Sequence, residues 1–359
     1  MTTSMSGTDI EIVDALRAFL AKKATLPHAL EQAESPAGFD RRLLQHLAEL
    51  GFFEVASTSE VGGLGCSPGL MGSCCAEAGR VLLGGPWLEQ LLTVRLLEGA
   101  GRSDLLDEVI VGSVLYSLPL ASTSWLRPPV VALEDGRARF AAASSELGFA
   151  AGVDAWLVPA HDAATGAIVL VRLAPDPARV SRRRGFSVLW PAFDALLDDA
   201  SGEVVAEIDD RLVATHLLDM SRMLACVSVG ATETVLARAT EYAKQREQFG
   251  RPIGSFQSLQ HRLADVFIDL EHTRSLVAAT WDPAPFERRQ LLSAMAKVAS
   301  DRLSVMAAET AVQVHGGVGF TWELPVHHFL KEALRRRTLP ESTGWYRLWL
   351  RDSVMNYNL

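Results

Sequence analysis

Along the first hundred residues, apolar side chains recur at intervals of three and four positions, the spacing that gathers them on one face of a helix. One such set is Ile10, Ile12, Val13, Leu16, Phe19 and Leu20, and a second, after the turn around Pro36, is Leu43, Leu44, Leu47 and Leu50. The stretch Gly62-Gly63-Leu64-Gly65 predicts a loop, because glycine permits backbone paths that side chains obstruct. Residues 1–110 are therefore predicted to form an N-terminal helical domain.

The period changes between residues 111 and 212. Apolar clusters there shrink to a few residues, β-branched residues alternate with polar ones, and turn-forming residues separate the clusters. The predicted strands are 113–118, 130–133, 155–159, 167–173, 186–189 and 202–205. This region is predicted to be a small middle β domain.

Helical periodicity returns after residue 212 and is sustained over longer segments. The predicted helices are 216–245, 256–281, 286–314, 325–337 and 342–355. Short connections between long helices favour antiparallel neighbours, so residues 213–359 are predicted to form a helical bundle. The fold class is mostly α with a middle β domain.

Composition narrows the function classes. Of 359 residues, 48% are hydrophobic and 21% are charged, as in an ordinary globular protein. The formal net charge of −9 and the lack of a long basic run argue against a nucleic-acid partner. Four cysteines without paired spacing predict neither a disulfide framework nor a zinc site, and no three histidines have ligand spacing, so no metal is expected. No export or membrane-spanning segment is indicated, which favours the cytoplasm.

Candidate chemistry concentrates in two segments. The first, REQFGRPIGSFQ at 246–257, places Arg246 and Gln248 just before a glycine- and proline-containing turn. An arginine offers a planar fork for phosphate and glycines allow close backbone approach, although a surface ion pair would explain the same arginine. These residues alone leave the ligand open.

The second segment, VQVHGGVGFTWE at 312–323, ends a long predicted helix and contains Gly316, Gly317 and Gly319. A glycine-rich helix stop with an aromatic anchor would explain it without any ligand. It lacks the preceding strand and following helix of a dinucleotide-binding fingerprint.

Together and in this order, the two segments resemble the acyl-CoA dehydrogenase family of flavoproteins. The resemblance extends to LAELGFFEVASTSEVGGLG at 47–65 and covers most of the chain. It implies a helical domain, a β-barrel-like domain and a four-helix bundle, assembled as a dimer of dimers. It also implies that FAD lies across a subunit interface, in contact with Arg246, Gln248, Phe249 and Gln257. Gln313, Gly316 and Gly317 would reach the cofactor of the neighbouring subunit, and Thr343 is assigned to the cofactor site as well.

The resemblance further implies the reaction. A carboxylate removes a proton α to the carbonyl of an acyl-CoA thioester, a hydride passes from the β carbon to the flavin, and the electrons go on to an electron-transfer flavoprotein. Many members carry the base in a Glu-Gly-Thr-Ser sequence after the glycine-rich motif. Glu341-Ser342-Thr343 matches it with one inserted residue, so Glu341 is the candidate base. A first-turn carboxylate that favours the helix dipole would equally explain Glu341.

Other positions depart from the family pattern. Some members carry the base at the start of the first long C-terminal helix, but Ser221 stands there, and nearby Asp219 is more simply a helix-capping acid. The family's Thr-Glu-Pro and Gly-Ser-Asp sequences of the middle domain are replaced by residues 117–124, SLPLASTS. Vicinal Cys74 and Cys75 are expected to be packed core residues. The run 335–337 is expected to be a solvated helix face, with the phosphates of coenzyme A as the alternative ligand.

Two functions therefore remain. One is an FAD-dependent acyl-CoA dehydrogenase that acts as a homomeric or heteromeric tetramer. The other is a non-catalytic FAD-binding subunit of a heteromeric enzyme, paired with a paralogous catalytic chain as in short members that resemble the steroid-degrading enzymes.

Overall fold

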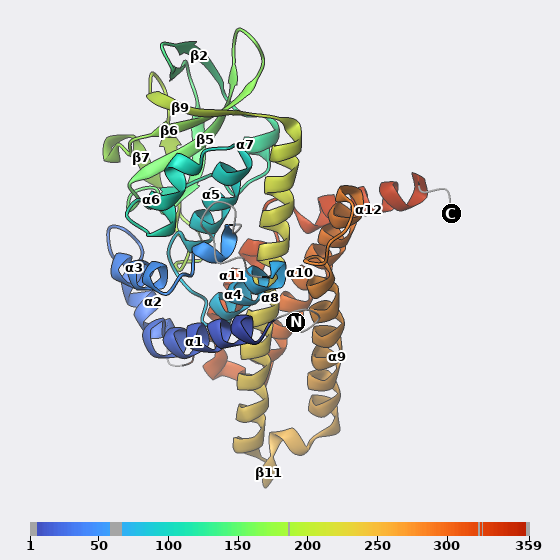
Figure 1. The fold of residues 1–359 in the computed structure, drawn as a ribbon. Helices are drawn as coiled ribbons and strands as arrows, with labels where there is room; N and C mark the ends of the chain where they lie inside the picture. The colour runs from blue at the N-terminus through green and yellow to red at the C-terminus, as the bar shows by residue number, and fades with distance from the viewer. Residues whose placement is uncertain (1–5, 58–66, 186, 322–323, 325, 357–359) are drawn as a thin grey trace. The chain divides into compact units, whose positions relative to one another are not determined.

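The computed structural model describes residues 6–57, 67–185, 187–321, 324 and 326–356, and the fold is mostly helical with strands in the middle of the chain (Figure 1). The chain divides into two compact units. The first, here called the helical unit, comprises Met1–Leu26, Ser67–Leu83 and Ser221–Leu359; the second, the mixed unit, comprises Pro27–Cys66 and Gly84–Met220. The three-domain boundaries expected at 110/111 and 212/213 stay a prediction.

In its described residues the mixed unit combines short helices with nine strands. Its helices are α2 (Leu26–Ala33), α3 (Arg41–Glu49), α5 (Trp87–Gly99), α6 (Leu106–Ile110) and α7 (Thr123–Leu126), with one-turn helices at Glu54–Ala56, Ser103–Leu105 and Pro177–Arg179. Its strands are β1 (Tyr116–Ser117), β2 (Val130–Glu134), β3 (Arg137–Phe140), β4 (Ser144–Gly148), β5 (Ala155–Asp162), β6 (Ile168–Leu173), β7 (Val180–Arg182), β8 (Ala192–Leu196) and β9 (Ser201–Ile208).

Five of these strands close into a ring. β5 pairs with β2, β2 with β3, β3 with β9, β9 with β6, and β6 returns to β5, while β1 adds to one end of β5. Strands β4, β8 and β7 form a separate sheet. Closure removes the exposed edges of an open sheet, and β5 is buried at seven of eight positions. The β-barrel-like architecture is confirmed.

Four predicted strands coincide with β2, β5, β6 and β9, whereas two predictions need correction. The strand expected at 113–118 shrinks to two residues. The strand expected at 186–189 is wrong: residue 186 lies outside the described residues, 187–189 are not in a strand, and β8 starts only at Ala192. Four short strands escaped the sequence analysis because each is only three to five residues long, too short to establish an alternating apolar pattern. One signal for β3 was present, since Asp135 and Gly136, both at positive φ, form a two-residue hairpin turn between β2 and β3.

The helical unit is built from long helices. They are α1 (Gly7–Lys23), α4 (Pro68–Arg80), α8 (Asp210–Gln245, from residue 221 on), α9 (Gln257–Ala279), α10 (Phe286–His315), α11 (Val326–Arg336) and α12 (Thr343–Asn356). The hairpin of β10 (Glu247–Gln248) and β11 (Arg251–Pro252) and a turn at Ile253–Ser255 join α8 to α9, and a turn at Gly316–Phe320 follows α10. α10 contacts α9, α11 and α12. The five predicted C-terminal helices are confirmed, with α8 starting six residues earlier than predicted.

The buried faces of the first helices are narrower than predicted. In α1, Val13, Leu16 and Leu20 are buried, but Ile10 is 49% exposed. In α3, Leu43, Leu44 and Leu47 are buried, whereas Leu50 beyond its end is 51% exposed. The predicted loop at 62–65 lies outside the described residues.

Helices α4 and α8 touch backbone to backbone. A Cβ on Gly79 would lie 2.2 Å from the Val227 carbonyl oxygen, and one on Gly230 would lie 1.8 Å from the Ala76 carbonyl oxygen. Only glycine fits at these two positions. Cys74 and Cys75 of α4 and Cys226 of α8 are buried free thiols, and burial raises the pKa of Cys75 and Cys226. They behave as small core residues.

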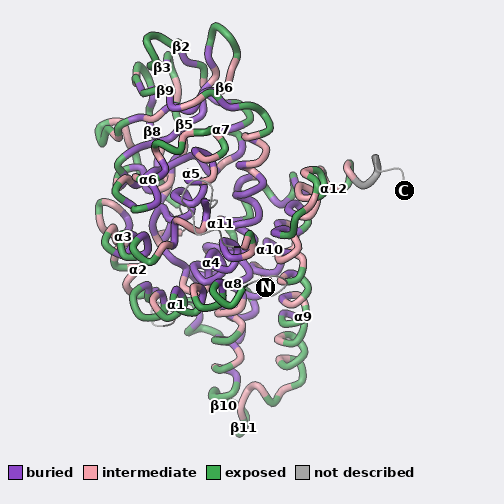
Figure 2. The backbone as a smooth tube through the Cα atoms, viewed as in Figure 1, coloured by how far each residue is buried: buried purple, intermediate pink, exposed green. Residues whose placement is uncertain are grey.

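Helices α8 and α9 differ in how much of their surface is buried (Figure 2). α8 is long and apolar enough to cross a membrane by length and composition, yet 78% of its most apolar window is buried within the structure, as in the core helix of a globular protein. α9 instead buries a single stripe of residues, namely Val266, Leu270, Thr273 and Val277. On its other side, Phe267 and Ile268 are 54% and 51% exposed.

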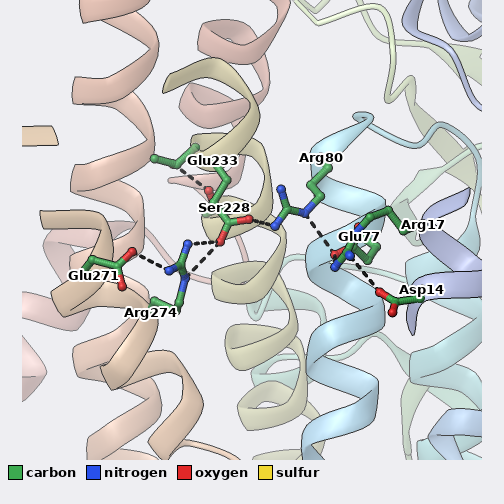
Figure 3. A network of polar contacts seen from close by, with 9 residues as sticks. Asp14, Arg17, Glu77, Arg80, Ser228, Glu233, Glu271 and Arg274 are labelled. Carbon is green, nitrogen blue, oxygen red and sulfur yellow. Dashed lines mark hydrogen bonds and ion pairs between the residues drawn. The ribbon is translucent and has the colours of Figure 1, made fainter. Parts of the chain in front are cut away.

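An ion-pair network links four helices of the helical unit (Figure 3). Arg17 of α1 bonds Glu77 of α4, and Arg80 of α4 pairs with both Glu77 and Glu233 of α8. Arg274 of α9 donates to Glu233 at 2.5 Å. The Glu233 side chain is only 12% exposed and serves two arginines, so the network depends on it.

We therefore expect Glu233→Gln to lower the free energy of unfolding by about 2 kcal/mol, because two arginines lose a poorly hydrated counter-charge. Urea denaturation of the purified variant measures the change. Glu271→Gln is the matched control, since Glu271 also pairs with Arg274 but is 43% exposed. Equal stabilities of the two variants would contradict the prediction.

A second prediction concerns His216, which is buried in the mixed unit against Trp125, with ring centroids 4.0 Å apart. Within the described residues neither ring nitrogen has a hydrogen-bond partner. Burial lowers the pKa of His216 to about 4, although the Asp219 carboxylate opposes this shift. In the unfolded chain the pKa of His216 is near its ordinary value of 6.5. Between about pH 6.5 and 4, His216 is therefore protonated in the unfolded chain but neutral in the folded protein.

Stability contributed by neutral His216 is complete above about pH 6.5 and decreases as the pH falls toward 4, by roughly 3 kcal/mol in total. His216→Phe should flatten this part of the dependence, as measured by urea denaturation between pH 7.5 and 4.5. His261→Gln, at an exposed position, should keep the wild-type slope. The same slope in His216→Phe would show that His216 does not titrate as the structure predicts.

Candidate active site

A cavity of about 510 Å³ lies in the helical unit where the two sequence motifs meet. It is lined by Tyr242, Arg246, Gln248, Ile253, Val314, His315, Gly316, Gly317, Val318 and Thr321. The end of α8 and the hairpin after it form one side, and the end of α10 with its glycine turn forms the other. Four predicted cofactor residues are thus brought together across about 70 residues of sequence. Gly316 and Gly317, which were expected to reach the cofactor of the neighbouring subunit, line the same cavity as Arg246 and Gln248.

The local backbone explains how Arg246 is presented. Phe249 and Gly250 both have positive φ, at 54° and 76°, and make the tight turn between Gln248 and Arg251. Next, the Ile253 amide donates to the Arg246 carbonyl at 2.8 Å, which turns the chain back beside the end of α8. The exposed Arg246 guanidinium has neither a hydrogen bond nor an ion pair with any described residue, so it is not the surface ion pair that would have explained it otherwise.

The glycine turn forms the opposite wall. Gly316 ends α10 with φ of 66°, a conformation that favours glycine. A Cβ at Gly316 or Gly317 would meet nothing within 4 Å, so both open their backbone to free space, whereas one at Gly319 would lie 2.9 Å from the Val312 carbonyl oxygen. Gly319 is therefore required for packing, and Gly316 and Gly317 are free to face a ligand.

Two aromatic rings that the sequence analysis did not single out complete the cavity. Tyr242 stacks on His315 with ring centroids 4.3 Å apart, and His315 Nδ1 donates to the Ala311 carbonyl oxygen at 2.7 Å. Tyr242 lies four residues before Arg246, whose amide donates to the Tyr242 carbonyl oxygen at 2.8 Å just beyond the end of α8. This one-turn spacing could have identified Tyr242. An unpaired guanidinium, open glycine backbone and flat apolar rings suit a ligand with a phosphate group and an aromatic portion.

The structure does not place every predicted cofactor residue on this cavity. Three of them are exposed and do not line the cavity, although they are close in sequence to residues that do: Phe249, Gln257 and Gln313. Phe249 is 92% exposed and packs edge-on against Phe256. Thr343 is buried, and its hydroxyl donates to Asp301 at 2.6 Å. The roles of these four residues toward FAD stay predictions.

Glu341, the candidate base, is half-buried and lies two residues before α12, so it is not a first-turn residue. Ser342 caps the helix by accepting from the Trp345 amide at 3.2 Å. The alternative base position is occupied by Ser221, whose hydroxyl lies 2.7 Å from that of Tyr346 in the first turn of α12. The two positions considered for the base in the sequence analysis therefore both adjoin the start of α12.

Other charged candidates are engaged elsewhere. Asp219 is buried and pairs with Arg95 at 3.2 Å. The run 335–337 is not a solvated face as predicted: Arg336 is buried and donates to Ser228 at 3.0 Å, and Arg335 pairs with Glu332. Among the described residues, no group of three or more His, Cys, Asp or Glu is arranged to hold a metal ion.

In the altered middle segment, Ser117 is buried and donates its hydroxyl to the Gly148 carbonyl oxygen at 2.6 Å, and Leu118 and Leu120 are core residues. Side chains so engaged are not presented to a ligand in this structure.

Comparison with known proteins agrees with this architecture. The family model described as acyl-CoA dehydrogenase, N-terminal domain, matches residues 7–107, and the one described as acyl-CoA dehydrogenase, C-terminal domain, matches residues 211–339. The acyl-CoA dehydrogenase IpdE2 of Mycolicibacterium smegmatis is 29% identical over 325 residues, 90% of this chain and 91% of that protein. IpdE2 of Mycobacterium tuberculosis is 44% identical over 122 residues, 33% of this chain and 36% of its own length.

Among solved structures, the ChsE4-ChsE5 complex of Mycobacterium tuberculosis contains a chain with a TM-score of 0.88, 21% identity and full coverage of both chains, which shows a shared fold. With family models on both sides of the strand region and this fold throughout, the chain belongs to the acyl-CoA dehydrogenase family, a family of FAD-dependent oxidoreductases.

Proposed function

We propose that this chain is an FAD-dependent acyl-CoA dehydrogenase that introduces an α,β double bond into an acyl-CoA thioester. The observation that carries the proposal is the cavity at which Arg246, Gln248, Gly316 and Gly317 gather. A flavin bound there would accept a hydride from the β carbon of the substrate. The electrons would pass to an electron-transfer flavoprotein. The buried free thiols of the helical unit suit a reducing compartment, in keeping with a cytoplasmic enzyme.

The residues of this chain would divide the work. Arg246 supplies a charge-assisted contact for the cofactor pyrophosphate, and the backbone of Gly316 and Gly317 lets the ligand approach closely. Glu341 takes the proton from the α carbon of the thioester. A half-buried carboxylate becomes a stronger base once substrate excludes water from around it.

The assembly we propose is a tetramer in which each FAD is shared between subunits. Phe249 at the hairpin tip is 92% exposed, and Phe320 at the end of the glycine turn is 67% exposed. Both are large apolar side chains close in sequence to residues that line the cavity. The exposed Phe267 and Ile268 of α9 add apolar surface in the same unit. Such side chains gain from burial against another subunit.

A second function, an FAD-binding subunit that supports a paralogous catalytic chain, draws on one specific observation. The segment 117–120, which replaces a family motif of the middle domain, is buried and bonded within this chain. The similarity of fold to a ChsE4-ChsE5 complex makes a mixed assembly a reasonable arrangement to test.

Arg246→Ala should weaken FAD binding by about 1.5–3 kcal/mol, because a charged contact to a partly desolvated phosphate is lost while the exposed position leaves folding unaffected. Flavin occupancy of the purified protein and titration of the apoprotein with FAD measure this. Arg251→Ala is the control, since Arg251 lies in the same hairpin but stacks on Phe256 and does not line the cavity. Normal FAD affinity of Arg246→Ala would refute the proposed phosphate site.

Glu341→Gln keeps the size and hydrogen bonding of the side chain but removes its proton affinity. The variant should load flavin normally, while bleaching of the flavin by acyl-CoA under anaerobic conditions slows by at least ~10²-fold. Stopped-flow absorbance measures the rate, with Glu287→Gln, at an exposed position on α10, as the control. A wild-type rate for Glu341→Gln in the purified complex would instead identify the chain as the supporting subunit.

A further inference from the structure

The segment 337–342, which carries Glu341, connects α11 to α12, and both of its ends are bound to one buried ion pair. This pair is Lys297 and Asp301, one turn apart on α10, with side chains 0% and 1% exposed. Their contact is short, with 2.5 Å between Lys297 Nζ and Asp301 Oδ2.

At the first end of the segment, Lys297 Nζ also donates to the carbonyl oxygen of Arg336 at 2.9 Å. Arg336 is the last residue of α11, and its carbonyl oxygen also accepts from the Leu339 amide at 3.1 Å, so Lys297 supplies a second donor to this helix-terminal carbonyl. A cation at a helix C-terminus is also favoured by the helix dipole.

At the other end, Thr343, the first residue of α12, donates its hydroxyl to the same Asp301 oxygen at 2.6 Å. Its amide donates to the Arg337 carbonyl oxygen at 3.1 Å, which closes the segment into a loop. One turn later, Tyr346 is held by its hydrogen bond to Ser221 of α8. The chain on either side of Glu341 is therefore fixed to α10 and α8.

Burial makes this arrangement costly to disturb. It raises the pKa of Asp301 and lowers that of Lys297, and the contact between the two groups opposes both shifts. Asp301 Oδ2 accepts hydrogen bonds from Lys297 and from Thr343. Lys297 also binds the carbonyl just before the segment, and Thr343 is the residue just after it. An apolar pair would join α10 to α12 at a smaller desolvation cost, but it would not fix the two ends with directional bonds.

We propose that Lys297, Asp301 and Thr343 are positioning residues, which together hold the segment 337–342 so that the Glu341 carboxylate is directed at the α carbon of the substrate. This inference rests on the proposed role of Glu341 as the base. A displacement of about 1 Å at a reacting group can cost ~10²-fold in rate, so a loop that carries a base must be held at both ends.

The test uses Thr343→Val, which removes one hydroxyl from the full-length protein at nearly constant volume and leaves the Lys297–Asp301 pair intact. Thr343→Ser restores the hydroxyl. Thr338→Val is the matched control, because the exposed Thr338 lies in the same segment but donates to Arg335 rather than to the pair. Two quantities are measured: amide hydrogen exchange of residues 337–343 without flavin or substrate, and the rate of anaerobic flavin reduction by acyl-CoA.

In Thr343→Val we expect amide exchange in the segment to accelerate at least ~10-fold. Flavin reduction should slow by about 10-fold or more with KM unchanged, because a base out of place affects the chemical step rather than substrate binding. Thr343→Ser should restore both quantities, and Thr338→Val should change neither.

Unchanged exchange in Thr343→Val would overturn the inference whether or not Glu341 is the base. Faster exchange with a normal rate of flavin reduction would overturn the positioning role while Glu341→Gln remains inactive. Full activity of Glu341→Gln is the separate result that refutes the proposed base itself.

Discussion

The helical unit depends on the direct backbone contact between α4 and α8. Gly79 and Gly230 each face a carbonyl of the other helix at a distance that excludes any side chain, so the helix axes approach as closely as backbones allow. This approach brings Arg80 within reach of Glu233 and packs the thiols of α4 and α8 into one core. Because α8 ends at the cavity, its placement also determines where Arg246 is presented.

The two parts of the proposed active site are built by opposite physical means. Arg246 precedes an exposed hairpin whose tight turn holds Phe249 at positive φ, and the Arg246 guanidinium is left accessible to a ligand. Glu341 is presented by a segment whose ends are held in a dry interior by buried charges. A phosphate contact gains from exposure before the ligand binds, whereas a base gains from a fixed position and little water.

Sequence periodicity was enough for the long helices and the major strands, because each has a sustained apolar pattern. It failed for β4, β7 and β8, which are three to five residues long and pair with one another in a separate sheet. The motifs identified four residues of the cavity, but the stacking of Tyr242 on His315 needed the crossing of two helices that are distant in sequence. The sequence shows that Lys297 and Asp301 are four residues apart. It does not show that this pair faces the ends of α11 and α12 instead of solvent.

The buried pair also constrains how this sequence can change over time. Loss of either Lys297 or Asp301 alone would leave the other as an uncompensated charge in the interior. A chain that replaced both with apolar residues could be as stable, yet each single step toward it passes through a destabilised protein. The two positions are thus expected to be exchanged together or not at all.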